Sequence, residues 1–358
     1  MNVLIACGGT GGHLFPGIAI AEELVKRGHT PFLVVSEKKV DKEASEKYPQ
    51  YTFISQPSRP KPATTSPKML GFVLSLLKVT SASKKLIKSH KIEAVIGMGG
   101  FTCFGPIFAA KSLKIPTFLH DSNAIPGKSN RLLSRYVNKV LLGLEPAKTY
   151  FPGKDCEVVG TPLRNEMKEL PAREVACQKF GLAPEKPTIL VFGGSQGAKN
   201  LNSIIVETAK ISEPFIQFLH VAGSFDFKRV EELSQDIPHH FPLAFCDDMP
   251  SAYAVADLVI CRSGASSMTE LSYLGLPSIL VPYPTSADDH QTKNAEAFSD
   301  KDAALLYKES ELDAETLKSI TSDLIKDAEA RERLSVNIRQ LSLDPAGAIC
   351  DLIESTTF

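Results

Sequence analysis

Short apolar runs alternate with longer segments of helical period along the whole chain, and this alternation restricts the fold more than any other feature. Residues 3–7 have the pattern of a strand, residues 17–27 that of a helix closed by Gly28, and residues 31–36 that of the next strand. This order predicts an α/β fold in which helices cover both faces of a parallel sheet. The further strands expected are residues 94–97, 117–120, 139–142, 157–159, 188–192, 215–221, 243–245, 258–260, 278–281 and 303–307.

The alternation is interrupted near Gly160-Thr161-Pro162-Leu163-Arg164 and then starts again. A length of 358 residues suits two domains. In each half, the first strand runs into a glycine-rich turn and a helix. We therefore expect two parallel-sheet domains that face each other across a cleft, with ligands at the carboxyl ends of the strands. The polar segment 311–343 predicts helices, which Asp344-Pro345 ends before a last short helix.

Composition excludes several classes of protein. The net charge of −1 argues against a nucleic acid as a partner bound through overall charge. Seven cysteines without a Cys-x-x-Cys pair fit a reducing compartment better than a disulfide framework or a zinc site. The N-terminal segment lacks the features of a signal peptide, and no apolar run reaches the ~20 residues of a spanning helix. We expect a soluble or peripheral protein.

The run Gly8-Gly9-Thr10-Gly11-Gly12-His13 joins the first strand to the first helix. Glycines there permit tight turns and let a ligand approach the backbone, and the helix N-terminus offers N–H groups to anions or polar groups. The first alternative is a turn that merely needs positive φ. The second is a dinucleotide site, because Glu37 follows the next strand. However, Leu14 stands where the Gly-x-Gly-x-x-Gly pattern requires its third glycine.

Two further glycine turns follow predicted strands. The turn Gly193-Gly194-Ser195-Gln196-Gly197-Ala198 can hold a diphosphate on its N–H groups, helped by the Ser195 hydroxyl. It is not a Walker loop, because no Gly-Lys-Ser/Thr follows at the required spacing. For Met98-Gly99-Gly100-Phe101, close approach of a ligand to the backbone and plain helix–strand packing are both open interpretations.

The run Cys261-Arg262-Ser263-Gly264-Ala265-Ser266-Ser267-Met268-Thr269-Glu270 has the same strand–turn–helix order. The Glu270 carboxylate, about one turn into the helix, can accept from two vicinal hydroxyls, as on a ribose, or can merely complement the helix dipole. Gln291 and Asn294 can bind sugar hydroxyls or be solvated. Asp300-Lys301-Asp302 has the spacing of metal-dependent transferases but falls where a helix should end. We interpret it as a turn and expect no metal and no other cofactor.

Residues 47–92 contain no Asp or Glu, and an apolar run, residues 69–77, lies within them. Apolar residues flanked by cations can bind an anionic membrane surface, with about 1 kcal/mol for each nearby charge. The alternative is a buried helix with a solvated basic rim. The lack of acidic residues favours the membrane surface as a partner. The cations are Arg59, Lys61, Lys68, Lys78, Lys84, Lys85, Lys88 and Lys91.

Five segments, in this order, resemble the MurG family of glycosyltransferases: residues 8–13, 120–123, 160–164, 193–198 and 262–270, followed by Gln291. They span nearly the whole chain. The resemblance implies the GT-B fold of glycosyltransferase family 28, with two Rossmann-like domains. The C-terminal helix of such proteins returns to the first domain. The domains implied are residues 1–163 with 345–358, on the acceptor and membrane side, and residues 164–344, which bind the UDP-sugar.

The resemblance also implies an activity. It is the transfer of N-acetylglucosamine from UDP-N-acetylglucosamine to the C4 hydroxyl of the N-acetylmuramyl unit of lipid I, which gives lipid II for peptidoglycan. The α linkage of the donor becomes β, so the displacement inverts. Such chemistry needs a base for the acceptor hydroxyl and stabilisation of the departing UDP. An enzyme of this kind is expected as a peripheral protein on the cytoplasmic face of the bacterial cell membrane.

Residue roles follow from the same resemblance. His13 matches a histidine considered as the base or as a group that acts in the transition state. Ser195 matches a serine that contacts the diphosphate, and Glu270 matches an acid that binds the ribose hydroxyls. Cys246 stands where the family often has isoleucine against the uracil, and Gln291 matches a glutamine on the sugar. The positions matched to the UDP-N-acetylglucosamine site are Thr10, Gly11, Gly12, Asn123, Arg164, Ser195, Cys246, Ala265, Ser266, Ser267, Met268, Thr269, Glu270 and Gln291.

One segment departs from the family. This chain has His120-Asp121-Ser122-Asn123 where the family commonly has His-Glu-Gln-Asn. The shorter side chain of Asp121 argues against a base role, and His13 is favoured because a neutral imidazole titrates near working pH. Four other functions stay open. They are a transferase with another lipid acceptor such as diacylglycerol, a UDP-sugar epimerase, an NAD(P) dehydrogenase, and a regulator that binds nucleotide-sugar without transfer.

Overall fold

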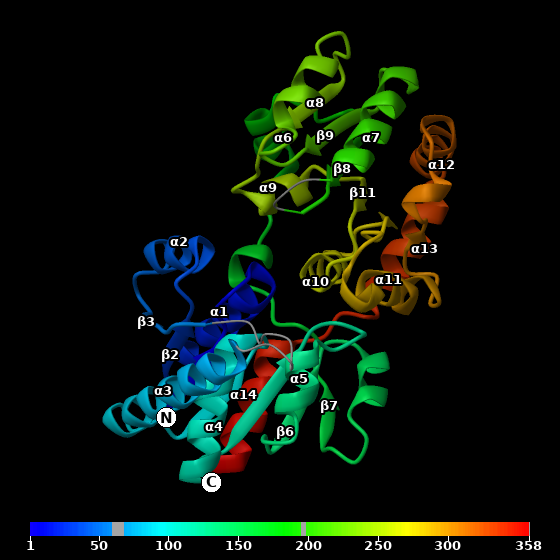
Figure 1. Cartoon of the computed structure of the whole chain (residues 1–358). Helices are drawn as coiled ribbons and strands as arrows, with labels where there is room; N and C mark the ends of the chain where they lie inside the picture. Colours follow the sequence, from blue (N-terminus) through cyan, green and yellow to red (C-terminus); the bar gives the residue numbers. More distant parts are fainter. Residues whose placement is uncertain (59–67, 195–197, 358) are drawn as a thin grey trace. The chain divides into compact units, whose positions relative to one another are not determined.

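The computed structural model describes residues 1–58, 68–194 and 198–357. The chain divides into two compact units (Figure 1). Unit 1 comprises Met1–Asn165 and Leu343–Phe358, and unit 2 comprises Glu166–Ser342. These boundaries lie next to those expected after residues 163 and 344. Each unit is described by itself.

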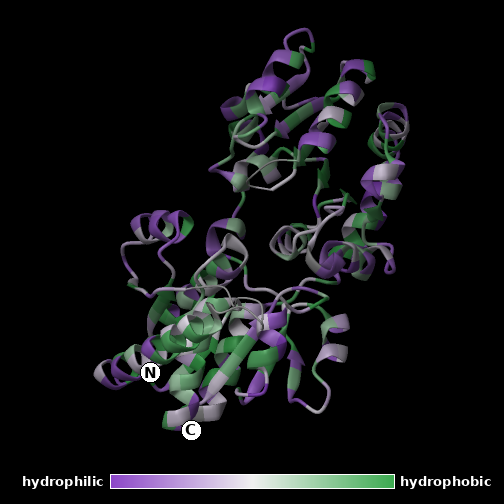
Figure 2. Ribbon diagram, viewed as in Figure 1, coloured by the Kyte–Doolittle hydropathy of each residue, from purple (hydrophilic) through white to green (hydrophobic). Residues whose placement is uncertain are grey.

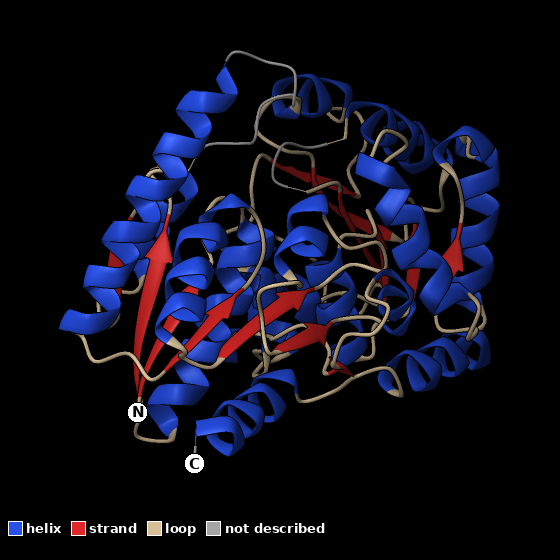
Figure 3. Ribbon diagram, turned by 60° about the horizontal axis from the view of Figure 1, so that its bottom comes forward, coloured by secondary structure: helices blue, strands red, loops and turns tan. Residues whose placement is uncertain are grey.

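Unit 1 contains a seven-stranded sheet in the order β3-β2-β1-β4-β5-β6-β7, and its strand pairs are parallel (Figure 3). Six of these strands were expected within one or two residues of their observed bounds. The seventh, β3, is a short edge strand whose residues are half-buried or exposed and form no clear apolar run. The strands are β1 (Asn2–Ala6), β2 (Thr30–Val35), β3 (Thr52–Ser55), β4 (Ala94–Gly97), β5 (Thr117–Asp121), β6 (Lys139–Leu142) and β7 (Cys156–Val158).

Helices cover both faces of this sheet. Alternate residues of β1 point to opposite faces, so they show which helices lie on each face. Val3 and Ile5 pack with residues of α1 and α14, whereas Leu4 and Ala6 pack with residues of α3 and α4. The helices of unit 1 are α1 (Gly11–Lys26), α2 (Lys39–Lys47), α3 (Lys68–Ser89), α4 (Phe104–Leu113), α5 (Lys128–Leu133) and α14 (Pro345–Thr357), with short 3-10 helices at Phe101–Cys103 and Glu145–Tyr150.

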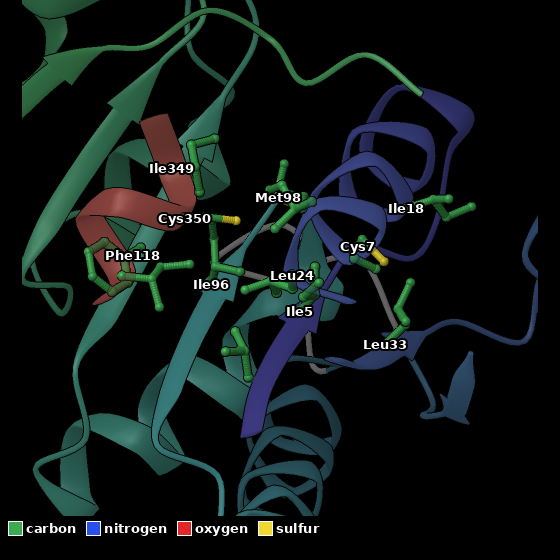
Figure 4. Close-up of a cluster of buried hydrophobic side chains, with 14 of the residues drawn as sticks. Ile5, Cys7, Ile18, Leu24, Leu33, Ile96, Met98, Phe118, Ile349 and Cys350 are labelled. Atoms are coloured by element: carbon green, nitrogen blue, oxygen red, sulfur yellow. The ribbon is translucent and has the colours of Figure 1, made fainter. Parts of the chain in front are cut away.

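The last helix, α14, belongs to the core of unit 1. Ile349, Cys350 and Ile353 are fully buried there, and Figure 4 shows Ile349 and Cys350 among the side chains of this core. Arg27, at the end of α1, donates to Asp351 at 2.6 Å and to Glu354 at 3.1 Å. Residues distant in sequence therefore join the C-terminal helix to the first one.

Unit 2 contains a six-stranded sheet in the order β10-β9-β8-β11-β12-β13, again with parallel pairs. The expected α/β fold with two parallel sheets is thus confirmed. The strand expected at residues 243–245 is wrong, because the structure forms β10 earlier, at His240–Leu243. The strands are β8 (Thr188–Phe192), β9 (Gln217–Val221), β10 (His240–Leu243), β11 (Leu258–Cys261), β12 (Ser278–Leu280) and β13 (Leu305–Leu306).

Several helices of unit 2 pack apolar side chains against this sheet. Leu201 and Ile205 of the helix after β8 and Leu317 of a later helix lie in one core with Ile189 and Val191 of β8. The helices are α6 (Arg173–Phe180), α7 (Lys199–Ile211), α8 (Phe227–Leu233), α9 (Met249–Ala254), α10 (Ala265–Leu274), α11 (His290–Ser299), α12 (Ala314–Lys326) and α13 (Ala328–Arg339), with 3-10 helices at Asn165–Met167, Ala287–Asp289 and Glu309–Glu311.

Helix α3, within the acid-free stretch, has two different faces. One face packs on α4, because a β-carbon on Gly105 would lie 2.5 Å from Val79 and 3.1 Å from the Ser83 hydroxyl. The other face is apolar over its first half and exposed, and Figure 2 shows both hydrophobic and hydrophilic residues along this helix. We call it the α3 surface. It comprises Leu70 (69% exposed), Val73 (43%), Leu74 (58%) and Leu77 (62%), followed by the exposed Lys78, Lys85 and Lys88.

Candidate active site

The first glycine loop is fixed by contacts from neighbouring segments of unit 1. A β-carbon on Gly8 would lie 2.3 Å from the backbone nitrogen of Ser36, so only glycine fits there. The Thr102 hydroxyl donates to the Gly8 carbonyl oxygen at 3.0 Å. The Lys38 ammonium donates to the Gly9 carbonyl oxygen at 2.8 Å. The protein itself therefore holds this loop in one shape.

Asp41, in α2, is the buried residue on which this loop is built. Its carboxylate accepts from the Gly9 N–H at 2.9 Å, the Ser36 N–H at 2.8 Å and the Ser36 hydroxyl at 2.5 Å. A dinucleotide pyrophosphate would need N–H groups of this loop, and Asp41 already takes that of Gly9. Glu37, the acid that a dinucleotide site would use, is exposed. The loop geometry therefore argues against a dinucleotide.

His13 lies in the first turn of α1, directly after this loop. Its Nδ1 atom is 3.2 Å from the Thr10 hydroxyl. Its ring covers the third glycine turn, because a β-carbon on Gly99 would lie 2.9 Å from Nε2 and one on Gly100 would lie 3.2 Å from Cε1. Both glycines have positive φ, +112° and +76°. The structure thus shows packing of the start of α1 on this turn, through the His13 ring.

Burial, followed by the nearby Lys38 charge, lowers the pKa of His13, although Asp41 opposes this shift. The half-buried imidazole is therefore neutral near pH 7 and can accept a proton. The helical hydrogen bonds of α1 start with the N–H groups of His13 and Leu14, both to the Thr10 carbonyl oxygen. The N–H groups that precede them have no acceptor within the helix, as at other helix N-termini, and this is where anions or polar groups bind in other proteins.

Asp121, at the end of β5, is enclosed by donors. Its carboxylate accepts from the Asn123 N–H at 3.0 Å, the Gly127 N–H at 3.1 Å and the Asn130 amide at 2.7 Å. Burial raises the pKa of this carboxyl. Because three hydrogen bonds tie Asp121 to the turn that follows it and to α5, we interpret this residue as a structural acceptor. Asn123 is half-buried in that same turn.

His120, beside Asp121, is fully buried and uncharged. Its Nε2–H donates to the Gly160 carbonyl oxygen at 2.8 Å, and burial lowers its pKa to about 4. Within the described residues, its Nδ1 atom and the Asn130 Oδ1 atom have no hydrogen-bond partner. His120 and Asp121 are therefore buried in unit 1, where hydrogen bonds to neighbouring residues hold both side chains.

Arg164 and Gly11 of the first glycine loop both lie next to the ring of Phe15. Its guanidinium carbon is 4.1 Å from the centre of the Phe15 ring, and its Nη1 donates to the Tyr48 hydroxyl at 3.1 Å. A β-carbon on Gly11 would lie 3.1 Å from that Phe15 ring. Within unit 1, the structure thus gathers Thr10, Gly11, Gly12, His13 and Arg164 around α1.

In unit 2, the second glycine turn follows β8. A β-carbon on Gly193 would lie 2.5 Å from the Ala198 side chain, and Gly194 has a φ of +94°. Both positions therefore require glycine. Ser195, the residue predicted to lie over a diphosphate, is outside the described residues.

The segment 265–270 forms the first turns of α10, with Gly264 as its N-cap. Met268 is buried, and the Thr269 hydroxyl donates to the Ala265 carbonyl oxygen at 2.9 Å. The Glu270 carboxylate accepts from the Tyr253 hydroxyl at 2.5 Å. Glu270 thus has a specific partner, which a role limited to the helix dipole does not require. Ala265, Ser266 and Ser267 are half-buried at the start of this helix.

The remaining predicted residues of unit 2 follow other strands of the same sheet. Cys246 is buried in the loop after β10, and burial raises its pKa. Gln291, in α11, accepts through Oε1 from the Tyr283 N–H at 2.9 Å. The Ser263 hydroxyl donates to the Gln291 carbonyl oxygen at 2.8 Å, which ties α11 to the turn after β11. The Asn294 amide is buried and donates to the Ser263 carbonyl oxygen at 3.1 Å, so Asn294 is not simply solvated.

Asp300-Lys301-Asp302 forms a turn after α11. Asp302 has a φ of +50° and pairs with Arg333 at 2.8 Å. The interpretation of this segment as a turn therefore agrees with the structure. Among the described residues, no group of three His, Cys, Asp or Glu side chains is arranged to hold a metal ion.

The chain matches two family models. The glycosyltransferase family 28 N-terminal domain matches residues 3–142, and the glycosyltransferase family 28 C-terminal domain matches residues 188–342. The chain belongs to glycosyltransferase family 28. The strand–turn–helix segments of both units, including the two glycine loops described above, thus occur within the matched regions.

Similar proteins extend this assignment over the full length. A relative from Exiguobacterium sp., named UDP-N-acetylglucosamine–N-acetylmuramyl-(pentapeptide) pyrophosphoryl-undecaprenol N-acetylglucosamine transferase, is 36% identical over 360 residues, 99% of each chain. The crystal structure of MurG from Acinetobacter baumannii is 27% identical, with a TM-score of 0.78 over 99% of both chains. The resemblance to the MurG family is confirmed. A UDP-GlcNAc 2-epimerase from Neisseria meningitidis, 15% identical with a TM-score of 0.71 over 99% of this chain and 100% of that one, has a similar fold.

Proposed function

We propose that this family 28 glycosyltransferase transfers N-acetylglucosamine from UDP-N-acetylglucosamine to the C4 hydroxyl of the N-acetylmuramyl unit of lipid I, forming lipid II. The observation that carries this proposal is the full-length similarity, at 33–37% identity, to relatives named for this transfer. The intact first loop and His13 support catalysis over a purely regulatory role, because a binding protein needs no neutral base.

The proposal assigns donor binding mainly to unit 2. The N-terminus of α10 offers N–H groups to a phosphate, and Glu270 accepts from the ribose hydroxyls. In this proposal the loop with Cys246 binds the uracil, Ser195 binds the diphosphate, and Gln291 binds the sugar. Asn123, Arg164 and residues 10–12 of unit 1 complete the proposed donor set. No metal or other cofactor has a part in it, and neither has a nucleic acid.

The proposal assigns the base to His13. If its Nδ1–H donates to the Thr10 hydroxyl, 3.2 Å away, the lone pair is on Nε2. The C4 hydroxyl of the acceptor gives its proton to Nε2 as its oxygen attacks C1 of the donor sugar from the face opposite UDP. The bond from C1 to the β-phosphate oxygen breaks, and UDP leaves with the electron pair. This displacement inverts the configuration at C1.

We further propose that the α3 surface binds the anionic cytoplasmic face of the bacterial cell membrane. Four exposed apolar side chains lie within two helical turns of α3, and three exposed lysines follow them on the same helix. Apolar insertion and attraction to anionic lipid both favour a peripheral position there. In the described residues, no helix is long and apolar enough to span a bilayer. Arg59 and Lys61 lie outside the described residues.

A panel of acceptors tests the proposed substrate. Labelled UDP-N-acetylglucosamine is incubated with a short-chain lipid I analogue, with diacylglycerol, or with no acceptor, each with and without a chelator. The proposal predicts labelled product only with the lipid I analogue, and no effect of the chelator. Product on diacylglycerol indicates another lipid acceptor, and UDP release without acceptor indicates an epimerase. An absorbance change with NAD(P) would indicate a dehydrogenase.

A further inference from the structure

Tyr253, on α9, connects two turns of unit 2 that lie at the carboxyl ends of strands. Its side chain is 1% exposed, and its hydroxyl donates to the Glu270 carboxylate at 2.5 Å. Its ring meets that of Phe192 edge to face, with the centres 6.1 Å apart at an angle of 76°. Phe192 is the last residue of β8, directly before Gly193. One buried ring therefore touches the strand end before the second glycine turn and the acid of α10.

The direction of the hydrogen bond between Tyr253 and Glu270 is fixed. Burial, followed by the Glu270 charge, raises the pKa of the Tyr253 phenol, so the phenol keeps its proton. The phenol is therefore the donor and the carboxylate the acceptor. A carboxylate has about four lone-pair sites, so a bond from Tyr253 leaves capacity to accept from hydroxyls of a ligand.

We propose that Tyr253 is a positioning residue that holds the Glu270 carboxylate for the vicinal ribose hydroxyls of the donor nucleotide. This inference rests on the proposed role of Glu270 in the donor site. A free glutamate side chain has several rotamers, and selecting one of them before binding lowers the entropy lost when the diol binds. The phenol is buried, so it acts through Glu270 rather than on the ligand itself.

The alternative is that Tyr253 only fills the core. The two roles differ in what the hydroxyl contributes. Tyr253→Phe keeps the ring and its packing on Phe192 but removes the donor. A core role alone makes this variant less stable without changing which nucleotides it prefers. A positioning role reduces the preference for nucleotides that carry both ribose hydroxyls.

The test is calorimetric titration of the full-length protein with UDP and with 2′,3′-dideoxy-UDP. The inference predicts that Tyr253→Phe weakens UDP binding about tenfold, the scale of a lost hydrogen bond to a charged group, and leaves dideoxy-UDP binding unchanged. In a Glu270→Ala background, Tyr253→Phe should have no further effect on UDP. Tyr136→Phe, which keeps an edge contact between its ring and Phe108, is the control and should bind both nucleotides like the wild type.

A second variant leaves the core intact. Glu270→Asp withdraws the carboxylate from the phenol while keeping the charge, and it should lose a similar part of the preference for UDP. The inference is overturned if Tyr253→Phe leaves UDP binding unchanged, if it weakens both nucleotides equally, or if its effect persists without Glu270. It is also overturned if the wild type does not prefer UDP. These binding results do not depend on the acceptor, so they are separate from a failure of the proposed transfer.

Discussion

The imidazole of His13 lies directly on the backbone of Gly99, where a β-carbon would be 2.9 Å from Nε2. This contact joins the start of α1 to the turn after β4. It also explains why two consecutive residues of that turn are glycines with positive φ. The position of the proposed base thus depends on a turn more than eighty residues away in the sequence.

Replacing Gly99 by alanine should displace the His13 ring. We expect Gly99→Ala to lower kcat by about 10- to 100-fold, because small displacements of a catalytic group cost rates of this order. The binding of UDP alone should change little. The measurement is steady-state transfer to the lipid I analogue. Gly28→Ala is the matched control, because Gly28 also has positive φ, +79°, but nothing lies within 4 Å of its added β-carbon. Equal losses in both variants would contradict the role of the Gly99 contact.

The pH dependence of transfer should report the His13 pKa. Because burial and Lys38 lower this pKa, kcat/KM should be constant near pH 7 and fall only as pH drops through a pKa below 6.5. Lys38→Gln removes the second cause, so the acidic limb should move to higher pH. Lys39→Gln is the control, since the exposed Lys39 pairs with Glu43 rather than with the glycine loop. If the acidic limb of the Lys38→Gln profile stays in place or moves to lower pH, His13 is not the group that titrates.

Acid should destabilise both units through buried neutral histidines. Burial lowers the pKa of His120 in unit 1 and of His240 in unit 2 to about 4. The unfolded chain binds these protons near pH 6.5, so stability is full above that pH and falls as pH decreases from about 6.5 to 4. Each histidine contributes at most roughly 3 kcal/mol, at 1.36 kcal/mol per pH unit. Urea unfolding followed at several pH values should show this loss. A flat profile from pH 7 to 4.5 would refute it.

Membrane binding should depend on the α3 surface. Leu74→Glu with Leu77→Glu should reduce co-sedimentation with vesicles of anionic lipid by about tenfold or more, because each glutamate removes an apolar anchor and adds repulsion. Transfer to a soluble acceptor should persist. Val175→Glu, at a position of unit 2 that is 62% exposed, is the control. Wild-type binding that ignores both salt and anionic lipid content would contradict the electrostatic part of this proposal.

The sequence predicts the regular parts of this fold well, because buried parallel strands such as β1 and β8 are short uninterrupted apolar runs. It fails for β10, where buried His240 is satisfied by the Ser234 hydroxyl at 2.7 Å. A polar residue with a buried partner interrupts the apolar pattern on which the prediction depends. The edge strand β3 was missed because its residues are only half-buried or exposed.

The candidate site was predictable where the chemistry is local. Glycine loops and helix starts, such as residues 8–13, can be recognised from a few adjacent residues. Asp41 and Tyr253 were missed because their partners, Gly9 and Glu270, are distant in the sequence. A weak signal existed for Asp41, which lies on the same helical face as the buried Ala44. No such signal existed for Tyr253, because a tyrosine in an apolar helix usually only packs in the core.

The role of His13 is tested most directly by the rate of N-acetylglucosamine transfer to the lipid I analogue by His13→Ala. If His13 is the base, kcat should fall by about 10²- to 10⁴-fold while UDP affinity stays near that of the wild type. His90→Ala, which removes an exposed histidine packed on Phe32, should keep full activity. A His13→Ala enzyme that retains near-full turnover would contradict the role of His13 as the base.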